Sequence, residues 1–222
     1  MSTMSTNSAV RRYAVTTAGA RQRLTAPILV LVVATAILQV SGGGLRATVA
    51  VACGYLFPVA AWLTVAVVGA DPDPTRALVA VGMGGTTRLR QQQRIAAAGL
   101  AGLGGAVAFV GGVLTDLPHV SLEDVAACLL ALVLSVCGGV ALGSLCAPPV
   151  IARPGWSLTA IAAVSVTDLA VPVLPPVGLA IRGLGTSAAA PSWPLLAGAT
   201  VATAALVTVA RLIEDRMLRR CE

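Results

Sequence analysis

Apolar runs long enough to cross a lipid bilayer recur along almost the whole chain. A helix that spans the hydrocarbon core needs about 20 predominantly apolar residues. Six such segments can be drawn, at 24–40, 48–70, 95–114, 125–146, 156–173 and 193–213. Only 11% of the 222 residues are charged, whereas a soluble domain carries about 25%. The sequence therefore predicts an all-α membrane protein with six transmembrane helices.

The placement of the basic residues predicts which way these helices cross the membrane. All 15 Lys/Arg positions are arginine. They cluster before the first segment, between the second and third, and at the end of the sixth and after it. Arg153, between the fourth and fifth, is on the same side, and only Arg46 and Arg182 fall on the opposite side. Cytoplasmic loops carry an excess of basic residues. We therefore expect a multi-pass protein of a bacterial cytoplasmic membrane, with both termini in the cytoplasm.

Composition also excludes several kinds of chemistry. Without lysine the chain has no P-loop, because that loop needs a Lys to reach the nucleotide phosphates, and it has no Schiff-base nucleophile. His119 is the single histidine, so no multi-histidine metal site is possible. Cys128, Cys137 and Cys146 lie nine residues apart without a CxxC motif, and we interpret them as buried apolar residues. We expect no catalytic residue, no metal and no cofactor on this chain.

The two ends of the chain form short cytoplasmic regions around one transmembrane domain. Residues 1–23 are predicted as a tail with an amphipathic interfacial helix at 9–20, whose arginines face anionic lipid. A disordered Ser/Thr tail with flanking anchors is the alternative. The transmembrane domain then covers 24–213, and 214–222 form a C-terminal tail.

Glycine is frequent inside the third and fourth segments. Gly105 and Gly112, and then Gly139 and Gly143, belong to series of small residues at four-residue spacing. Small residues at this spacing let helices in lipid approach closely, which gains van der Waals contact. Such stripes indicate either close packing of helices within one bundle or helices that slide past each other or dimerise.

The fifth segment and the chain after it form a broken region. Pro172, Pro175 and Pro176 interrupt the apolar sequence "VTDLAVPVLPPVGLAIRGLG", and no straight helix runs through three such prolines. We therefore predict broken, re-entrant helices on the external side between the fifth and sixth spans. Asp168 is an intramembrane carboxylate just before the prolines, which makes all four residues candidates for a transport path or gate. The alternative for Asp168 is a cap on the next short helix.

The loop between the second and third spans has the pattern of a short amphipathic helix. Asp73 suits the N-cap, Pro74 the first helical position, and Leu78 and Val81 belong to an apolar stripe at helical spacing. Glycines then end this helix, and Thr86 or Thr87 is expected to cap a second one that leads into the third span. A helix of two or three turns is unstable alone. It either anchors in the membrane interface or docks onto another cytoplasmic protein.

Taken together, the stretch "PTRALVAVGMGGTTRLRQQQRI" and the six-span plan resemble an actinobacterial-like type-2 ABC exporter permease. The resemblance implies that the loop is a coupling helix that contacts an ABC ATPase subunit, through Asp73, Pro74, Arg76, Leu78 and Val81. It also implies two ATPase copies, which hold ATP and Mg, and a second permease chain, identical or related. The region between the last two spans is short here, so gating roles do not carry over.

From these features we expect the transmembrane subunit of an ATP-driven exporter. The predicted path is almost uncharged, which suits an amphiphilic substrate such as a lipid, a peptide antibiotic or a hydrophobic drug. Membrane lipids are the other expected partners, and nucleic acid is not. Two alternatives remain, a proton-coupled secondary transporter that uses Asp168 and a non-catalytic membrane immunity or assembly protein.

Overall fold

The computed structural model describes residues 22–40, 44–69, 82, 85–117, 119–148, 150–151, 154–171, 177–185 and 190–219. Within these ranges the regular structure is entirely helical, which confirms the predicted all-α class. The helices are α2 (Gln22–Val40), α3 (Leu45–Val68), α5 (Thr86–Asp116), α6 (Leu122–Cys146), α7 (Pro154–Ala170), α8 (Val177–Leu184) and α9 (Trp193–Arg219).

Four of these helices are long and apolar enough to cross a membrane, namely α3, α5, α6 and α9. This confirms the general character of a multi-pass membrane protein. Helix α2 carries a shorter apolar stretch, Leu24–Gln39. Helix α7 has 17 residues and α8 has eight, so each alone is shorter than the roughly 20 residues that a span requires.

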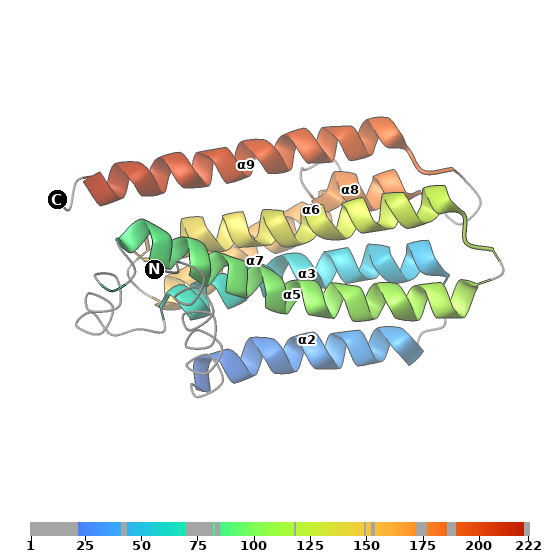
Figure 1. The fold of residues 1–222 in the computed structure, drawn as a ribbon, viewed down its shortest axis with the longest axis horizontal. Helices are drawn as coiled ribbons and strands as arrows, with labels where there is room; N and C mark the ends of the chain where they lie inside the picture. The colour runs from blue at the N-terminus through green and yellow to red at the C-terminus, as the bar shows by residue number, and fades with distance from the viewer. Residues whose placement is uncertain are drawn as a thin grey trace, which may run out of the picture.

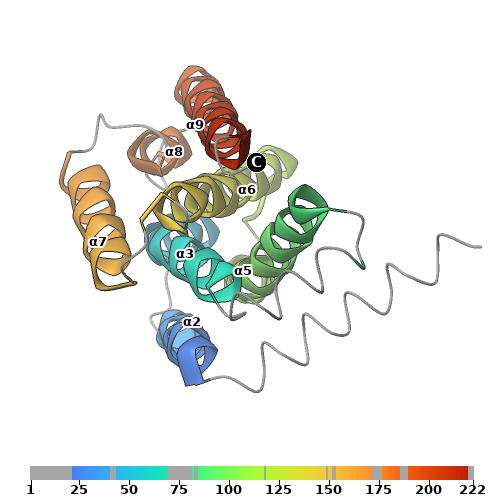
Figure 2. The same cartoon turned by 90° about the vertical axis from the view of Figure 1, so that its left-hand side faces the viewer.

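Helix α3 is the centre of the bundle. It packs against α2, α5, α6, α7 and α8, while α9 lies on the outside against α6 and α8 (Figure 2). Most α3 side chains are buried as a result, and Leu56, Leu63 and Val49 are almost fully enclosed. A helix that is apolar on every side and buried on most of them is typical of the core of a membrane bundle.

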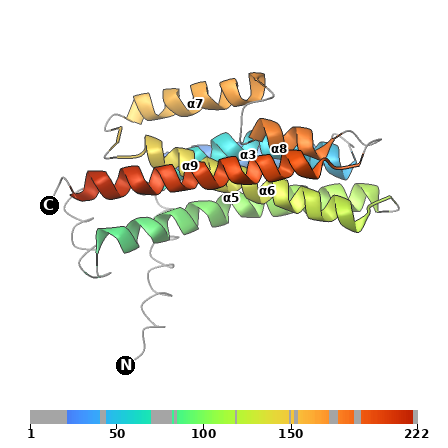
Figure 3. The ribbon, with the colours of Figure 1, turned by 90° about the horizontal axis from the view of Figure 1, so that it is seen from above.

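The helices run between two ends of the bundle that differ in charge. Helices α2 and α5 begin at one end, and α3, α6 and α9 finish there (Figure 1). We call this the basic end, because it carries Arg88, Arg90, Arg94, Arg211 and Arg216. The opposite end, with Asp116, Glu123 and Asp124, is called the acidic end. Helix α8 and the first turn of α9 also lie there (Figures 1 and 3).

The starts of α5 and α6 are specified in different ways. Helix α5 begins at Thr86, as predicted, but its N-cap is Gly85 and no side chain caps it. Gly85 has a φ of +135°, which favours glycine because it has no Cβ. The prediction that Thr86 or Thr87 provides the cap is therefore wrong. Helix α6 starts with a capping box in which Ser121 and Asp124 each accept the other's backbone N–H.

Glycine sets the distance between α3 and α6. A Cβ built on Gly139 would overlap the Phe57 carbonyl oxygen and lie 2.8 Å from the Cβ of Ala60. On Gly143 it would overlap the carbonyl oxygen of Ala61 and lie 2.7 Å from the Cβ of Thr64. The two backbones are thus as close as glycine allows, and the stripe lies inside the bundle.

Gly105 and Gly112 of α5 also lie in contacts within the bundle, with more room around them. A Cβ on Gly105 would lie 3.3 Å from the Cδ1 of Leu56, and one on Gly112 would lie 3.1 Å from the Cδ1 of Leu45. These nearest atoms belong to flexible side chains of α3, and the closest backbone atom, the Cα of Leu45, lies 3.4 Å from the Cβ position of Gly112. These two positions therefore tolerate a methyl group better than Gly139 and Gly143.

Candidate functional site

The predicted coupling residues Asp73, Pro74, Arg76, Leu78 and Val81 lie outside the described residues, as does the interfacial helix expected at 9–20. The flanking helices, however, are described. Helix α3 ends and α5 begins at the basic end (Figure 1). The loop that carries the predicted coupling helix therefore connects to the bundle at this end.

Asp168 is the most deeply buried acid in the described chain, with 1% of its surface exposed. Helix α7 places it near the start of α8, and the backbone N–H groups of Val177 and Gly178 face its carboxylate. Neither oxygen, however, reaches good hydrogen-bond geometry with a described donor. Pro172, Pro175 and Pro176 lie in the undescribed stretch between α7 and α8. Asp168 thus borders the break, with the geometry of an incomplete helix cap.

A cluster of buried charges joins α5 to α9 at the basic end. The Glu214 carboxylate lies 3.6 Å from Nη1 of Arg90 and is ion-paired with Arg94. Arg90 and Glu214 are each 8% exposed, and the neighbouring Gln93 is 4% exposed. Charges as buried as these are retained only when they are paired. The cluster therefore links the first turns of α5, next to the predicted coupling loop, to α9 through long side chains.

A second set of polar contacts centres on Arg46 at the acidic end. Its Nε donates a 2.8 Å hydrogen bond to Oδ1 of Asp124, and the two side chains form an ion pair. Its Nη1 also lies 3.5 Å from the carbonyl oxygen of Leu184, the last residue of α8. One guanidinium thus joins the starts of α3 and α6 to the end of α8.

Two further hydrogen bonds strengthen this end. The backbone N–H of Leu45 donates to Oδ2 of Asp116 over 3.1 Å, which ties the end of α5 to the start of α3. The indole N–H of Trp193 donates to Oε1 of Glu123 over 2.8 Å, which ties α9 to α6. Every acidic residue that gives this end its name therefore holds two helices together.

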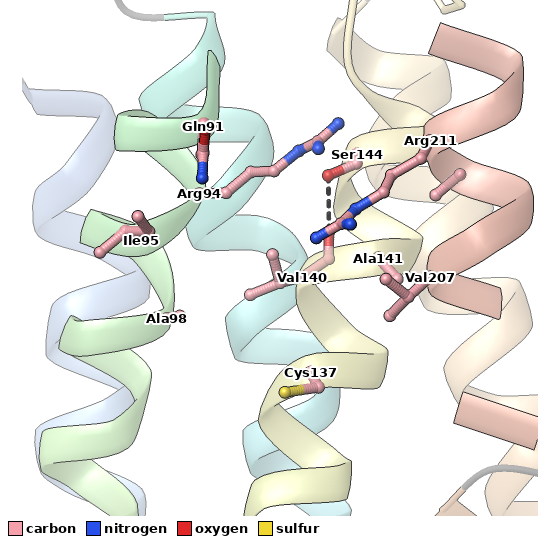
Figure 4. A pocket seen from close by; sticks show the side chains of 11 residues that line it. Gln91, Arg94, Ile95, Ala98, Cys137, Val140, Ala141, Ser144, Val207 and Arg211 are labelled. Carbon is pink, nitrogen blue, oxygen red and sulfur yellow. Dashed lines mark hydrogen bonds between the residues drawn. The ribbon is translucent and has the colours of Figure 1, made fainter. Parts of the chain in front are cut away.

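A groove opens on the side of the bundle where α5, α6 and α9 meet. Its basic-end part has a volume of about 270 Å³ and is lined by Arg94, Arg211 and Ser144, among others. The Arg94 side chain, from α5, and the Arg211 side chain, from α9, reach toward each other across α6 (Figure 4). The Ser144 hydroxyl donates to the carbonyl oxygen of Val140 over 2.8 Å. The lining is otherwise largely apolar.

The cysteines differ in exposure. Cys53, Cys128 and Cys146 are buried, as predicted for small apolar residues, but Cys137 is exposed and faces the groove. The prediction that Cys137 is buried is therefore wrong. No group of His, Cys, Asp and Glu side chains among the described residues has the arrangement of a metal site.

Sequence reasoning did not find the ion pairs or the groove. The four-residue spacing of Arg90 and Arg94 places both on one helix face, which is a usable signal that they share a partner. Glu214 follows the sixth apolar segment directly, at the same end. To predict that they pair, one must also know how α5 and α9 are rotated about their own axes, and this cannot be derived from the sequence.

Comparisons with known proteins identify no relative. No protein-family model matches the chain, and neither a curated protein nor a solved structure is significantly similar to it.

Proposed function

We propose that this chain is the transmembrane subunit of an ATP-driven exporter, with its termini in the cytoplasm of a bacterial cell. The observation that carries the proposal is the buried cluster of Arg90, Arg94 and Glu214. Helix α5 starts directly after the predicted coupling loop, and this cluster joins α5 to α9. A force on the loop would therefore move α5 and α9 together.

Six crossings are supported by the directions of the helices. Helices α6 and α9 both run from the acidic end to the basic end (Figure 1). The chain between them must return across the bundle, and α7 followed by α8 provides this return (Figure 3). Helix α2 similarly leads from the basic end to the start of α3. We propose α2 as the first span and α7 with α8 as a broken fifth span.

The motor is proposed to be a separate chain. Because the sequence has no lysine, it cannot form a P-loop. Two ABC ATPase subunits would bind ATP and Mg and dock onto the predicted helix at 73–85, and a second permease chain, identical or related, would complete the assembly. The largely apolar groove lining favours an amphiphilic substrate such as a lipid, a peptide antibiotic or a hydrophobic drug.

Replacing Arg76 by Glu together with Leu78 by Asp is expected to uncouple the protein from its motor. The reversed charge and the new acid remove both a polar and an apolar contact from the coupling helix. Co-purification with a P-loop ATPase from a neighbouring gene should fall at least about tenfold, since a loss of 1.4 kcal/mol in binding is already tenfold. ATP-dependent transport in vesicles should fall in parallel.

The matched control is Arg88→Glu with Thr87→Asp, which changes the same charges on the exposed first turn of α5. Both variants should unfold at the wild-type temperature. If the loop variant kept full complex formation and ATP-stimulated transport, the coupling role would be wrong.

Proton-coupled transport is the second candidate, because Asp168 is fully buried and neither of its oxygens has a well-aligned hydrogen-bond donor among the described residues. Under the leading proposal this carboxylate is a helix cap. Asp168→Asn should then leave ATP-driven transport within about twofold of wild type, because Asn is an equally good N-cap. Asp168→Leu, which cannot accept a hydrogen bond, should lower the unfolding temperature. Proton-driven uptake without ATP that disappears in Asp168→Asn would support the second candidate instead.

A further inference from the structure

The basic-end part of the groove contains more positive than negative charge. Arg94 and Arg211 extend into the same space from opposite walls (Figure 4). Glu214 is already ion-paired with both Arg90 and Arg94, while Arg211 is exposed. Two guanidinium groups that converge repel each other. An anion between them would relieve this repulsion.

An apolar hollow continues this space along the membrane. It has a volume of about 360 Å³, lies between α5 and α6, and shares Ala98 and Cys137 with the basic-end part. Its wall on α5 runs from Ala98 to Val110, which at 1.5 Å per residue is about 18 Å. One leaflet of the hydrocarbon core is roughly 15 Å deep. The hollow is thus long enough to hold one acyl chain of a lipid in a single leaflet.

The residues that line this hollow are apolar, so the hollow suits a hydrocarbon chain better than water. Phe109, Leu132 and Val136 belong to it, together with small residues such as Gly102 and Gly105. A Cβ built on Gly102 would meet no atom within 4 Å, so the space in front of it is open. Together the two parts fall within the range of about 300–1,000 Å³ that is usual for ligand pockets.

We propose that this groove binds one anionic phospholipid, with its phosphate between Arg94 and Arg211 and one acyl chain along the hollow. Arginine recognises phosphate in a bidentate manner, and basic pockets between membrane helices bind anionic headgroups. This groove is the one that the proposed function offers to an amphiphilic substrate, but lipid binding there does not require that the chain couples to an ATPase.

A second copy of this chain is a poorer occupant of the groove. A symmetric dimer contact places the same surface on both sides. It would bring a second Arg94 and a second Arg211 to this end, and the chain already has a net charge of +6. A lipid phosphate supplies the charge of opposite sign, whereas the dimer contact increases the repulsion.

The test measures lipid retention by native mass spectrometry of the full chain. The protein is incubated with equal amounts of dioleoyl phosphatidylglycerol and dioleoyl phosphatidylcholine, which share their acyl chains. Wild type should retain one phosphatidylglycerol in preference to phosphatidylcholine. Arg211→Gln should lower this retention about fivefold, because one basic residue near a lipid surface is worth that much. Arg216→Gln, on the same helix and also exposed, should not.

A second pair of variants tests the hollow. Cys137→Trp fills it and should lower phosphatidylglycerol retention, whereas Val201→Trp, on an exposed face of α9 outside the groove, should not. If Cys137→Trp fails to fold, Val133→Trp replaces it, since Val133 lines the same hollow and is 57% exposed.

Three outcomes would overturn the proposal. The first is equal retention of both lipids, which means that the arginines do not select the headgroup. The second is displacement of phosphatidylglycerol by inorganic phosphate alone, which identifies a simple anion site. The third is a lipid-independent dimer that Cys137→Trp dissociates without changing phosphatidylglycerol retention, which assigns the groove to a second copy.

Discussion

Replacing both Gly139 and Gly143 by leucine is expected to abolish folding, so that no monodisperse protein is recovered from detergent. Even the first added carbon overlaps a carbonyl oxygen of α3 at each position. Backbone cannot move aside as a side chain can, so α3 and α6 must separate. Since α3 is the centre of the bundle, this separation would loosen its contacts with all the other helices around it.

Single alanine substitutions make this effect measurable. Gly143→Ala should cost about 3 kcal/mol, the upper part of the usual range for overpacking. In a chain of this size that cost lowers the unfolding temperature by roughly 6–12 °C, which differential scanning fluorimetry can follow. Gly105→Ala should cost less, because its neighbours are side chains that can adjust.

The matched control is Gly99→Ala on α5, where an added Cβ meets no atom within 4 Å. It should unfold at the wild-type temperature or slightly above it, since alanine favours helix over glycine by about 1 kcal/mol. If Gly143→Ala were as stable as Gly99→Ala, the close contact between α3 and α6 would be absent.

Glu214→Gln is expected to produce the second large loss. It leaves Arg90 buried without the carboxylate that pairs with it. Breaking a buried ion pair on one side costs about 3–5 kcal/mol, which here corresponds to a decrease of roughly 6–20 °C in unfolding temperature. The control is Glu123→Gln, an exposed acid at the opposite end, which should change the temperature by only a few degrees.

A double variant separates lost pairing from lost packing. Arg90→Met combined with Glu214→Gln removes the more buried guanidinium along with the charge, and the Gln can still hydrogen-bond to Arg94. The double variant should therefore be more stable than Glu214→Gln alone. Additive losses from the two substitutions would contradict a shared ion pair, because residues in one network couple energetically.

The positions of the helices could be predicted from hydrophobicity and from the residues that begin or end a helix. The predicted segment 24–40 corresponds to α2, Gln22–Val40, because Ser41 and the glycines after it end the apolar run. The segment 125–146 corresponds to α6, Leu122–Cys146, whose start is the Ser121 capping box. The fifth segment, 156–173, is longer than α7, which ends at Ala170, just before Pro172.

The candidate site could not be predicted because it depends on how the helices are rotated. In a soluble protein an apolar stripe indicates which face of a helix is inside. In a membrane bundle both the interior and the lipid-facing surface are apolar, so this signal is lost. Cys137 and Cys128 look equivalent in sequence, yet one is exposed and the other is buried. The partners of Arg46 and Glu214 lie far from them along the chain. Predicting these partners also requires the rotation of each helix about its axis.

The uneven distribution of cross-links has a mechanical consequence. Arg46, Asp116 and Glu123 connect five helices to one another at the acidic rim. At the other rim, the ion pairs among the described residues connect α5 to α9, and a hydrogen bond from Ser157 to the carbonyl oxygen of Cys146 connects α7 to α6. We expect a bundle connected in this way to open at the basic rim while the acidic rim stays closed. Distances between spin labels on neighbouring helices should therefore change more during transport the farther the labels lie from Arg46.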